Sequence, residues 1–246
     1  QKYGFCGPAI NVVNACSSGT DAIGVAMSWI NAGICDVAIA GGADELNRVP
    51  ISGFNSLGIL SDEICRPFDS ERNGLNLGEG AGVVILSSTP IVDSPVAILA
   101  GYGNVNDAYH LTAPRPDGSG LEFALKTALR QKGLSLMDID FINCHGTATR
   151  NNDSTEGRTL NRLFGSSLNF YSTKGYTGHT LGAAGGIEAV LTCMSLKGGW
   201  LPANAGFENI DLEIGISPIS RFTTINCKYA ISTSLAFGGT ASAILF

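Results

Sequence analysis

Short apolar runs alternate with amphipathic stretches along the whole chain. Runs that end at glycine or turn residues predict strands at residues 10–15, 36–40, 81–86, 96–102, 139–144, 168–172, 229–234 and 241–246. Helical spacing predicts helices at residues 20–32, 121–132, 154–164 and 181–196, whereas residues 51–76 are predicted to be rich in loops. This alternation favours an α/β fold whose sheets are covered on both faces.

The composition supports one large folded region. Of 246 residues, 44 % are hydrophobic and only 15 % are charged, which predicts a large core. No linker or charge block marks a boundary, so residues 1–246 are interpreted as a single region. The net charge of −6 argues against a nucleic-acid partner. No apolar run has the length of a membrane span, and the first four residues show no signal-peptide pattern.

The number and spacing of the cysteines indicate which cellular compartment the protein occupies. Their number is odd and no pair has C-x-x-C spacing: Cys6, Cys16, Cys35, Cys65, Cys144, Cys193 and Cys227. A disulfide framework or a zinc site is not indicated, so no metal is expected. A reducing cytoplasm fits this pattern best.

The first chemically suggestive segment is NACSSGT, residues 14–20. Cys16 stands between a predicted strand and a predicted helix. A thiol at a helix N-terminus faces the positive end of the helix dipole, which favours the thiolate. A buried cysteine acting as a small hydrophobic residue is the other interpretation, and this segment alone leaves both open.

Two further segments contain histidine. NCHGTAT (143–149) places His145 at the C-terminal end of a predicted strand, a usual position for ligand sites in α/β sheets. STKGYTGHTLGAAGG (172–186) places Lys174 and His179 in a glycine-rich connection before a helix. Its spacing matches neither phosphate-binding glycine motif, which excludes a nucleotide-binding loop. Taken alone, His145 is better explained as a structural histidine than as a catalytic one.

The last segment is LAFGGT, residues 235–240, between the final two predicted strands. Gly238 and Gly239 permit positive φ angles, so the turn could present backbone N–H groups to an anion. An ordinary hairpin turn is the alternative.

Together and in this order, these segments resemble the β-ketoacyl synthases of the thiolase superfamily, especially the elongating synthases of bacterial fatty-acid and type II polyketide systems. The resemblance covers essentially the whole chain and includes GGAD (41–44), RPFD (66–69), GEGAG (78–82) and DAYH (107–110). It implies a layered αβαβα fold, here lacking most of the first half, and normally a homodimer. Residues 10–15 and 36–40 would lie near the dimer contact.

The resemblance also implies a reaction, the decarboxylative Claisen condensation of an acyl group with malonyl-acyl-carrier protein. Cys16 would hold the acyl group as a thioester. His145 and His179 would assist decarboxylation and stabilise the enolate. Lys174 would organise the site together with Glu188. Phe237 would gate the acyl pocket, and its backbone N–H would join that of Cys16 in binding the oxyanion.

The same resemblance implies which residues contact the substrate. Thr112, Thr147 and Thr149 match positions that line the pantetheine tunnel, and Glu188 is also expected to bind substrate. No resident cofactor is implied, because 4'-phosphopantetheine arrives on the acyl carrier protein. Four arginines are candidates for docking the carrier protein: Arg66, Arg72, Arg115 and Arg150. For each of them, a solvated or paired surface residue is the favoured interpretation.

The chain departs from the family pattern chiefly before Cys16, where relatives carry a further stretch of about the size of a small domain. The sequence therefore resembles the C-terminal portion of a longer enzyme, and the chain alone is expected to be inactive or nearly so. Smaller departures are Ala148 between the two threonines, Leu235-Ala236 before Phe237, and Gly58 near a carrier-contacting arginine of several relatives.

Four alternatives remain. A chain-length-factor-like partner would lack the cysteine that is present here. A thiolase would carry a second cysteine near the position of the FGG turn. A cysteine hydrolase would not explain Lys174 and His179. A non-catalytic chain that only binds the carrier protein or a second subunit would be recognised by binding of that partner without turnover. Acyl chain length and pathway are not encoded in any recognisable motif.

Overall fold

The computed structural model describes Gly4 and residues 6–246. Its centre is a mixed sheet of five strands in the order β3–β9–β8–β4–β5. The strands are β3 (Gly101–Asn106), β9 (Thr240–Leu245), β8 (Ala230–Ala236), β4 (Phe141–Asn143) and β5 (Asn169–Tyr171). β4 pairs in parallel with β5 and β8, whereas β9 runs antiparallel to β8 and β3.

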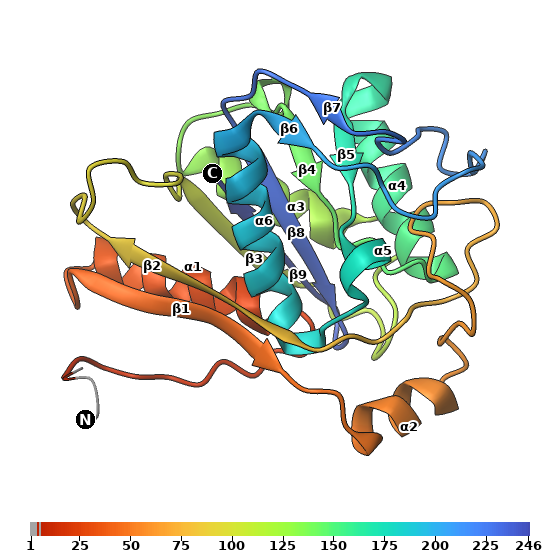
Figure 1. The fold of residues 1–246 in the computed structure, drawn as a ribbon, viewed down its shortest axis with the longest axis horizontal. Helices are drawn as coiled ribbons and strands as arrows, with labels where there is room; N and C mark the ends of the chain where they lie inside the picture. Colours follow the sequence, from red (N-terminus) through yellow and green to blue (C-terminus); the bar gives the residue numbers. More distant parts are fainter. Residues whose placement is uncertain (1–3, 5) are drawn as a thin grey trace.

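Helices cover both faces of this sheet (Figure 1). On one face lie α3 (Ser119–Arg130) and α4 (Arg150–Phe164), which pack on the alternate β9 residues Ala241, Ala243 and Leu245. On the other face lie α1 (Ser18–Asn31) and α6 (Ala184–Gly198), which pack against Ile244. The period of two in β9 thus divides its side chains between two cores.

An antiparallel pair, β1 (Val37–Asp44) and β2 (Gly80–Ser87), covers the outer side of α1 and α6. The described residues therefore form four layers: this pair, two helices, the five-stranded sheet, and two further helices (Figure 1). The predicted α/β class is confirmed.

Short elements complete the chain. They are α2 (Arg48–Ser56), the 3-10 helices Leu136–Asp138, Gly165–Ser167 and Leu181–Ala183, α5 (Lys174–Thr177), and the pair β6 (Trp200–Leu201) and β7 (Thr223–Thr224). The helix α2 lies inside the stretch predicted to be loop-rich. Asn47 begins it by accepting a hydrogen bond from the Val49 backbone N–H at 3.0 Å.

Three strand predictions were wrong in position or existence. Residues 10–15 form no strand, because no described strand lies alongside to pair with them; Asn14 makes only an isolated bridge with Cys16. β1 continues through Gly41 and Gly42 instead of ending there. β3 begins at Gly101, five residues later than predicted.

Glycine has a packing role in β1 that explains the second error. A Cβ on Gly42 would clash with the carbonyl oxygen of Gly182, so this position must be glycine for the segment before α6 to approach, whereas a Cβ on Gly41 would clash with Gly82 of the neighbouring strand β2. The glycine pair therefore marks close contact with neighbouring elements, whereas the sequence pattern reads as a strand stop.

Candidate active site

Cys16 lies in a tight elbow at the start of α1. The residue before it, Ala15, has φ +47°, a left-handed conformation that is costly for any residue except glycine. The Ser17 backbone N–H closes the elbow on the carbonyl of Asn14 at 3.2 Å. This geometry directs the thiol inward, and Cys16 is only 6 % exposed.

The two histidines come from loops that are far apart in sequence. His145 follows β4, and His179 follows α5. Their buried rings meet edge to face, with centroids 5.2 Å apart. The backbone of His179 is held by Asn76 and Gly78, through hydrogen bonds of 2.7 and 3.0 Å.

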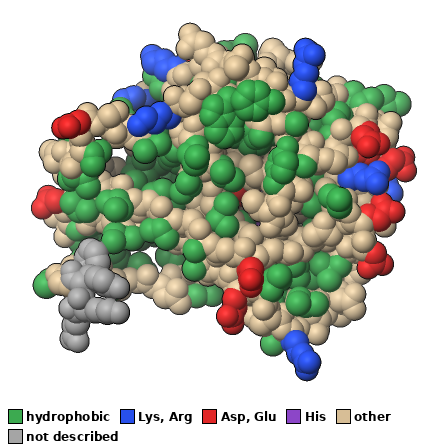
Figure 2. Space-filling view, viewed as in Figure 1, with side chains coloured by type: hydrophobic (Ala, Val, Ile, Leu, Met, Phe, Trp, Pro, Cys, Tyr) green, Lys and Arg blue, Asp and Glu red, His purple; other side chains and the backbone are tan. Residues whose placement is uncertain are grey.

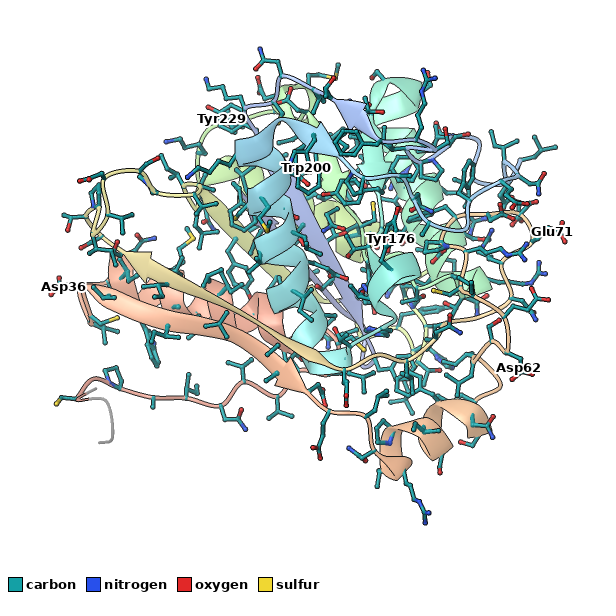
Figure 3. The ribbon with its side chains drawn as sticks, viewed as in Figure 1. Asp36, Asp62, Glu71, Tyr176, Trp200 and Tyr229 are labelled. Carbon is teal, nitrogen blue, oxygen red and sulfur yellow. The ribbon has the colours of Figure 1, made fainter. Side chains whose placement is uncertain are left out.

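Lys174 lies directly behind His145. Its buried ammonium donates to the carbonyl oxygen of His145 at 2.6 Å and lies 3.3 Å from His145 Nδ1. The same ammonium is paired with the buried carboxylate of Glu188 on α6. On the opposite side of α5, Tyr176 donates from its hydroxyl to the Ala203 carbonyl at 2.8 Å, which anchors the helix that carries Lys174 (Figure 3).

Phe237 closes the site from the β8–β9 turn. Its backbone N–H lies close enough to the Cys16 sulfur to lower the pKa of that thiol. Its ring stacks on Phe54 of α2 at 5.6 Å, and Phe54 also meets His179 edge-on at 6.5 Å. Phe54 was not predicted, because it lies in the stretch that was expected to be loop.

These side chains surround one cavity of about 270 Å³. Cys16, His145, His179 and Phe237 line it, and so do the three threonines expected along the pantetheine tunnel, Thr112, Thr147 and Thr149. The Thr147 and Thr149 hydroxyls are 3.0 Å apart. Lys174 and Glu188 do not line this cavity. Glu188 was grouped with the substrate-binding residues, but its position behind Lys174 favours a positioning role instead.

Burial controls the protonation states in the site. It raises the pKa of the Cys16 thiol to about 11, although the charge of Lys174 and two backbone N–H groups act in the opposite direction. Burial therefore outweighs the favourable position of Cys16 at the helix N-terminus, and the thiol is favoured over the thiolate. Burial also lowers the pKa of His145 and His179 well below the usual value, and the Lys174 charge adds to this effect.

Two buried carboxylates that the sequence did not single out support the His145 loop. Glu156 on α4 accepts hydrogen bonds from the backbone N–H groups of His145 and Gly146, at 2.9 and 2.8 Å. Asp153 accepts from the Phe68 backbone N–H at 2.7 Å. Both carboxylates have a pKa raised by burial. Acidic residues on a polar-looking helix gave no sequence signal for this role.

The candidate docking arginines separate into different environments. Arg72 is 2 % exposed and pairs with Asp211, so it cannot serve as a surface docking charge. Arg66 pairs with Glu63 at 3.3 Å. Arg115 donates to the Asp107 carbonyl at 3.2 Å and lines the cavity. Arg150, also on the cavity wall, is exposed.

The described part of the chain shows no group of three or more His, Cys, Asp or Glu residues arranged to hold a metal ion. None of its helices is long and apolar enough to cross a lipid bilayer.

Solved ketosynthases share this fold. A type II polyketide synthase acyl-carrier protein in complex with its ketosynthase superposes with a TM-score of 0.94 at 31 % identity, over 99 % of this chain and 64 % of that one. A ketosynthase in complex with its chain length factor, from Xenorhabdus doucetiae, gives a TM-score of 0.89 at 39 % identity, over 97 % of this chain and 60 % of that one. The fold is thus that of the thiolase-like ketosynthases.

Comparisons of the sequence with family models and with related proteins lead to the same family as the fold. The beta-ketoacyl synthase N-terminal domain matches residues 1–90, and the C-terminal domain matches residues 96–208. The mitochondrial 3-oxoacyl-[acyl-carrier-protein] synthase of Arabidopsis thaliana is 37 % identical over all of this chain and 58 % of its own length. The 3-oxoacyl-[acyl-carrier-protein] synthase 2 of Staphylococcus aureus is 35 % identical over 99 % of this chain and 64 % of its own length. The chain belongs to the β-ketoacyl synthase family and spans about three fifths of the length of these relatives.

Proposed function

We propose that the protein carries out the decarboxylative Claisen condensation of a cysteine-bound acyl group with malonyl-acyl-carrier protein, giving a 3-oxoacyl-acyl-carrier protein. The observation that carries this proposal is the meeting of one thiol, two imidazoles and Phe237 of the β8–β9 turn around a single cavity. The names of the relatives support the same reaction.

In the first half-reaction, the Cys16 sulfur attacks the thioester carbonyl of an acyl-carrier protein. The tetrahedral oxyanion is stabilised by the backbone N–H groups of Cys16 and Phe237. Collapse forms a thioester at Cys16 and releases the carrier as its free thiol, which takes up the proton that Cys16 gives up. The buried site keeps the thiol protonated until a substrate arrives.

In the second half-reaction, malonyl-carrier protein loses carbon dioxide and becomes an enolate. Because the Lys174 ammonium faces His145 Nδ1, that nitrogen is an acceptor and the ring carries its proton on Nε2, from where it can donate to the enolate oxygen. His179 supplies a second donor. Both rings are neutral, so they stabilise the charge with little tendency to protonate the carbanion. The carbanion then attacks the acyl carbonyl and expels the Cys16 thiolate.

The partners belong to the same proposal. The substrate is carried on the phosphopantetheine arm of an acyl carrier protein, and Thr147 and Thr149 offer hydroxyls to the amides of that arm. The reaction uses no resident cofactor. A homodimer and a cytoplasmic location fit the family resemblance and seven cysteines that are all free.

The test is a reconstituted reaction of the native protein with acyl- and malonyl-carrier protein. We expect release of carbon dioxide together with a 3-oxoacyl product. Cys16→Ala should abolish the product, whereas Cys35→Ala, at a partly exposed cysteine away from the cavity, should retain it. Release of free acid without carbon dioxide would instead identify a hydrolase, and carrier binding without turnover in the wild-type protein would identify a non-catalytic subunit.

A further inference from the structure

Asp21, in the first turn of α1, is buried and has an unusual set of partners. It is 4 % exposed, and its side chain accepts five hydrogen bonds. Two reach Oδ2, from Asn14 Nδ2 (2.6 Å) and Ser17 Oγ (2.7 Å). Three reach Oδ1, from Tyr102 OH (2.9 Å), Asn104 Nδ2 (3.0 Å) and Ser242 Oγ (2.5 Å).

All five partners are neutral donors. Across the described residues, no Lys, Arg or His forms a salt bridge with Asp21. Burying an unpaired charge is costly unless hydrogen bonds replace the lost water. A carboxylate kept at such a cost in the first turn of the nucleophile helix suggests a role beyond packing.

The Oδ2 bonds hold the two sides of the nucleophile elbow. Asn14 precedes Cys16 and Ser17 follows it, so one carboxylate oxygen clamps the chain around the residue whose neighbour, Ala15, has φ +47°. A strained conformation persists only where the surroundings over-determine it. Asp21 thus helps to keep the backbone N–H of Cys16 in place.

The network also reaches the other side of the thiol. Asn14 Oδ1 accepts a hydrogen bond from Thr240 Oγ1 at 3.3 Å, and Thr240 begins β9 directly after the Phe237-Gly238-Gly239 turn. Ser242, two residues farther along β9, donates to Asp21 Oδ1. One carboxylate therefore connects the elbow of Cys16 with the strand that supports the Phe237 turn.

We propose that Asp21 is a positioning residue that sets the spacing of the two backbone N–H groups, of Cys16 and Phe237, that receive the oxyanion of acyl transfer. It acts through Asn14, Ser17 and β9 and does not touch the substrate. This inference rests on the proposed function only in taking Cys16 as the residue that is acylated.

The test compares two reactions of the same sulfur in the native protein. Acylation of Cys16 by the acetyl thioester of N-acetylcysteamine passes through an oxyanion, whereas alkylation by iodoacetamide does not. In Asp21→Asn, an amide group replaces one acceptor oxygen, so the network loses at least one of its anchors. We expect the acylation rate to fall about 10- to 100-fold, while the alkylation rate changes by less than about threefold. Mass spectrometry of the Cys16 peptide measures both rates.

Two further variants complete the design. Asn14→Ala, at a half-buried position, cuts the link between Asp21 and Thr240 and should reproduce the selective loss of acylation even if Asp21→Asn does not fold. Tyr102→Phe removes a hydrogen bond to Asp21 that comes from β3 and should leave the ratio of the two rates unchanged.

Equal loss of both reactions in Asp21→Asn, or unchanged acylation in Asn14→Ala at an unchanged melting temperature, would overturn the proposal. Neither reaction at Cys16 uses malonyl-carrier protein. Failure of the wild-type protein to condense malonyl substrate would therefore count against the proposed function and leave this inference standing.

Discussion

At the scale of single residues, burial governs the site. It raises the pKa of Cys16 and lowers the pKa of both histidines, so the reacting groups are neutral before substrate enters. The ion pair nearest the histidines, Lys174 and Glu188, lies behind the cavity wall. A site arranged in this way stabilises charge where it develops and leaves the resting enzyme unreactive.

The histidines lead to a prediction about pH. We expect His145 and His179 to stay neutral in the folded protein from pH 8 to pH 6, whereas in the unfolded chain both titrate near about 6.5. The unfolded state then binds two more protons below that pH, so these two groups lower the free energy of unfolding as the pH falls.

Imidazole ¹⁵N chemical shifts of histidine-labelled protein would measure this directly, with a urea-unfolded sample as the control. NMR is preferable to a melting curve, because burial raises the pKa of Glu188 to about 7 and contributes to stability in the opposite sense. If the imidazole of His145 or His179 titrates near about 6.5 in the folded protein, the prediction is contradicted.

The ion pair leads to a second prediction. Lys174→Met leaves the Glu188 carboxyl buried, at 2 % side-chain exposure, without its cation. We expect the free energy of unfolding to fall by about 3–5 kcal/mol, as measured by urea denaturation. In the double variant Lys174→Met/Glu188→Leu, most of that loss should be recovered. If the double variant is less stable than the single one, the pair is not coupled in this way.

At the scale of elements, glycine sets the distance between layers. A Cβ on Gly82 of β2 would lie 2.2 Å from the Ile187 backbone nitrogen of α6, and one on Gly19 of α1 would lie 2.7 Å from the Gly186 nitrogen. Backbone atoms cannot yield to such contacts as a flexible side chain can. The high glycine content therefore reflects close packing of strands on helices as well as turns.

This packing predicts opposite effects of one substitution at two sites. Gly82→Ala should lower the free energy of unfolding by about 1–3 kcal/mol, because the layers must separate. Gly53→Ala, in α2 with nothing within 4 Å of its added Cβ, should raise it by about 0.5–1 kcal/mol. Thermal and urea unfolding of both variants would check this; a stabilising Gly82→Ala would show that α6 is free to shift.

At the scale of the whole molecule, one face of the outer strand pair is apolar and exposed. The outward residues Val37, Ile39, Val83 and Ile85 are 46–61 % exposed, whereas Val84 and Leu86 point to the core. Figure 2 shows apolar side chains on the part of the surface where β1 and β2 lie. Both strands of this pair also have an unpaired edge among the described residues.

Exposed apolar strands predict association of the isolated chain 1–246. We expect its apparent mass in light scattering to rise with concentration, and Val83→Lys/Ile85→Lys to reduce this rise. Leu212→Lys is the control, because Leu212 is 87 % exposed but lies outside the patch. If the chain stays monomeric, or if Leu212→Lys reduces association as much as Val83→Lys/Ile85→Lys does, the exposed face of β1 and β2 is not the surface that associates.

Periodicity in the sequence predicted the α/β class and most helices, because it is a local property, and the short motifs singled out Cys16, His145, His179 and Phe237 through their resemblance to a known family. It did not reveal α2, the continuation of β1 through its glycine pair, or the absent strand at residues 10–15, since each depends on what lies alongside. The tertiary structure alone decided that Phe54 packs on Phe237, that Arg72 is buried, and that Glu156 and Asp21 support the site. Those contacts join residues distant in sequence, and burial, which only packing creates, determines how the cysteine and histidines are protonated.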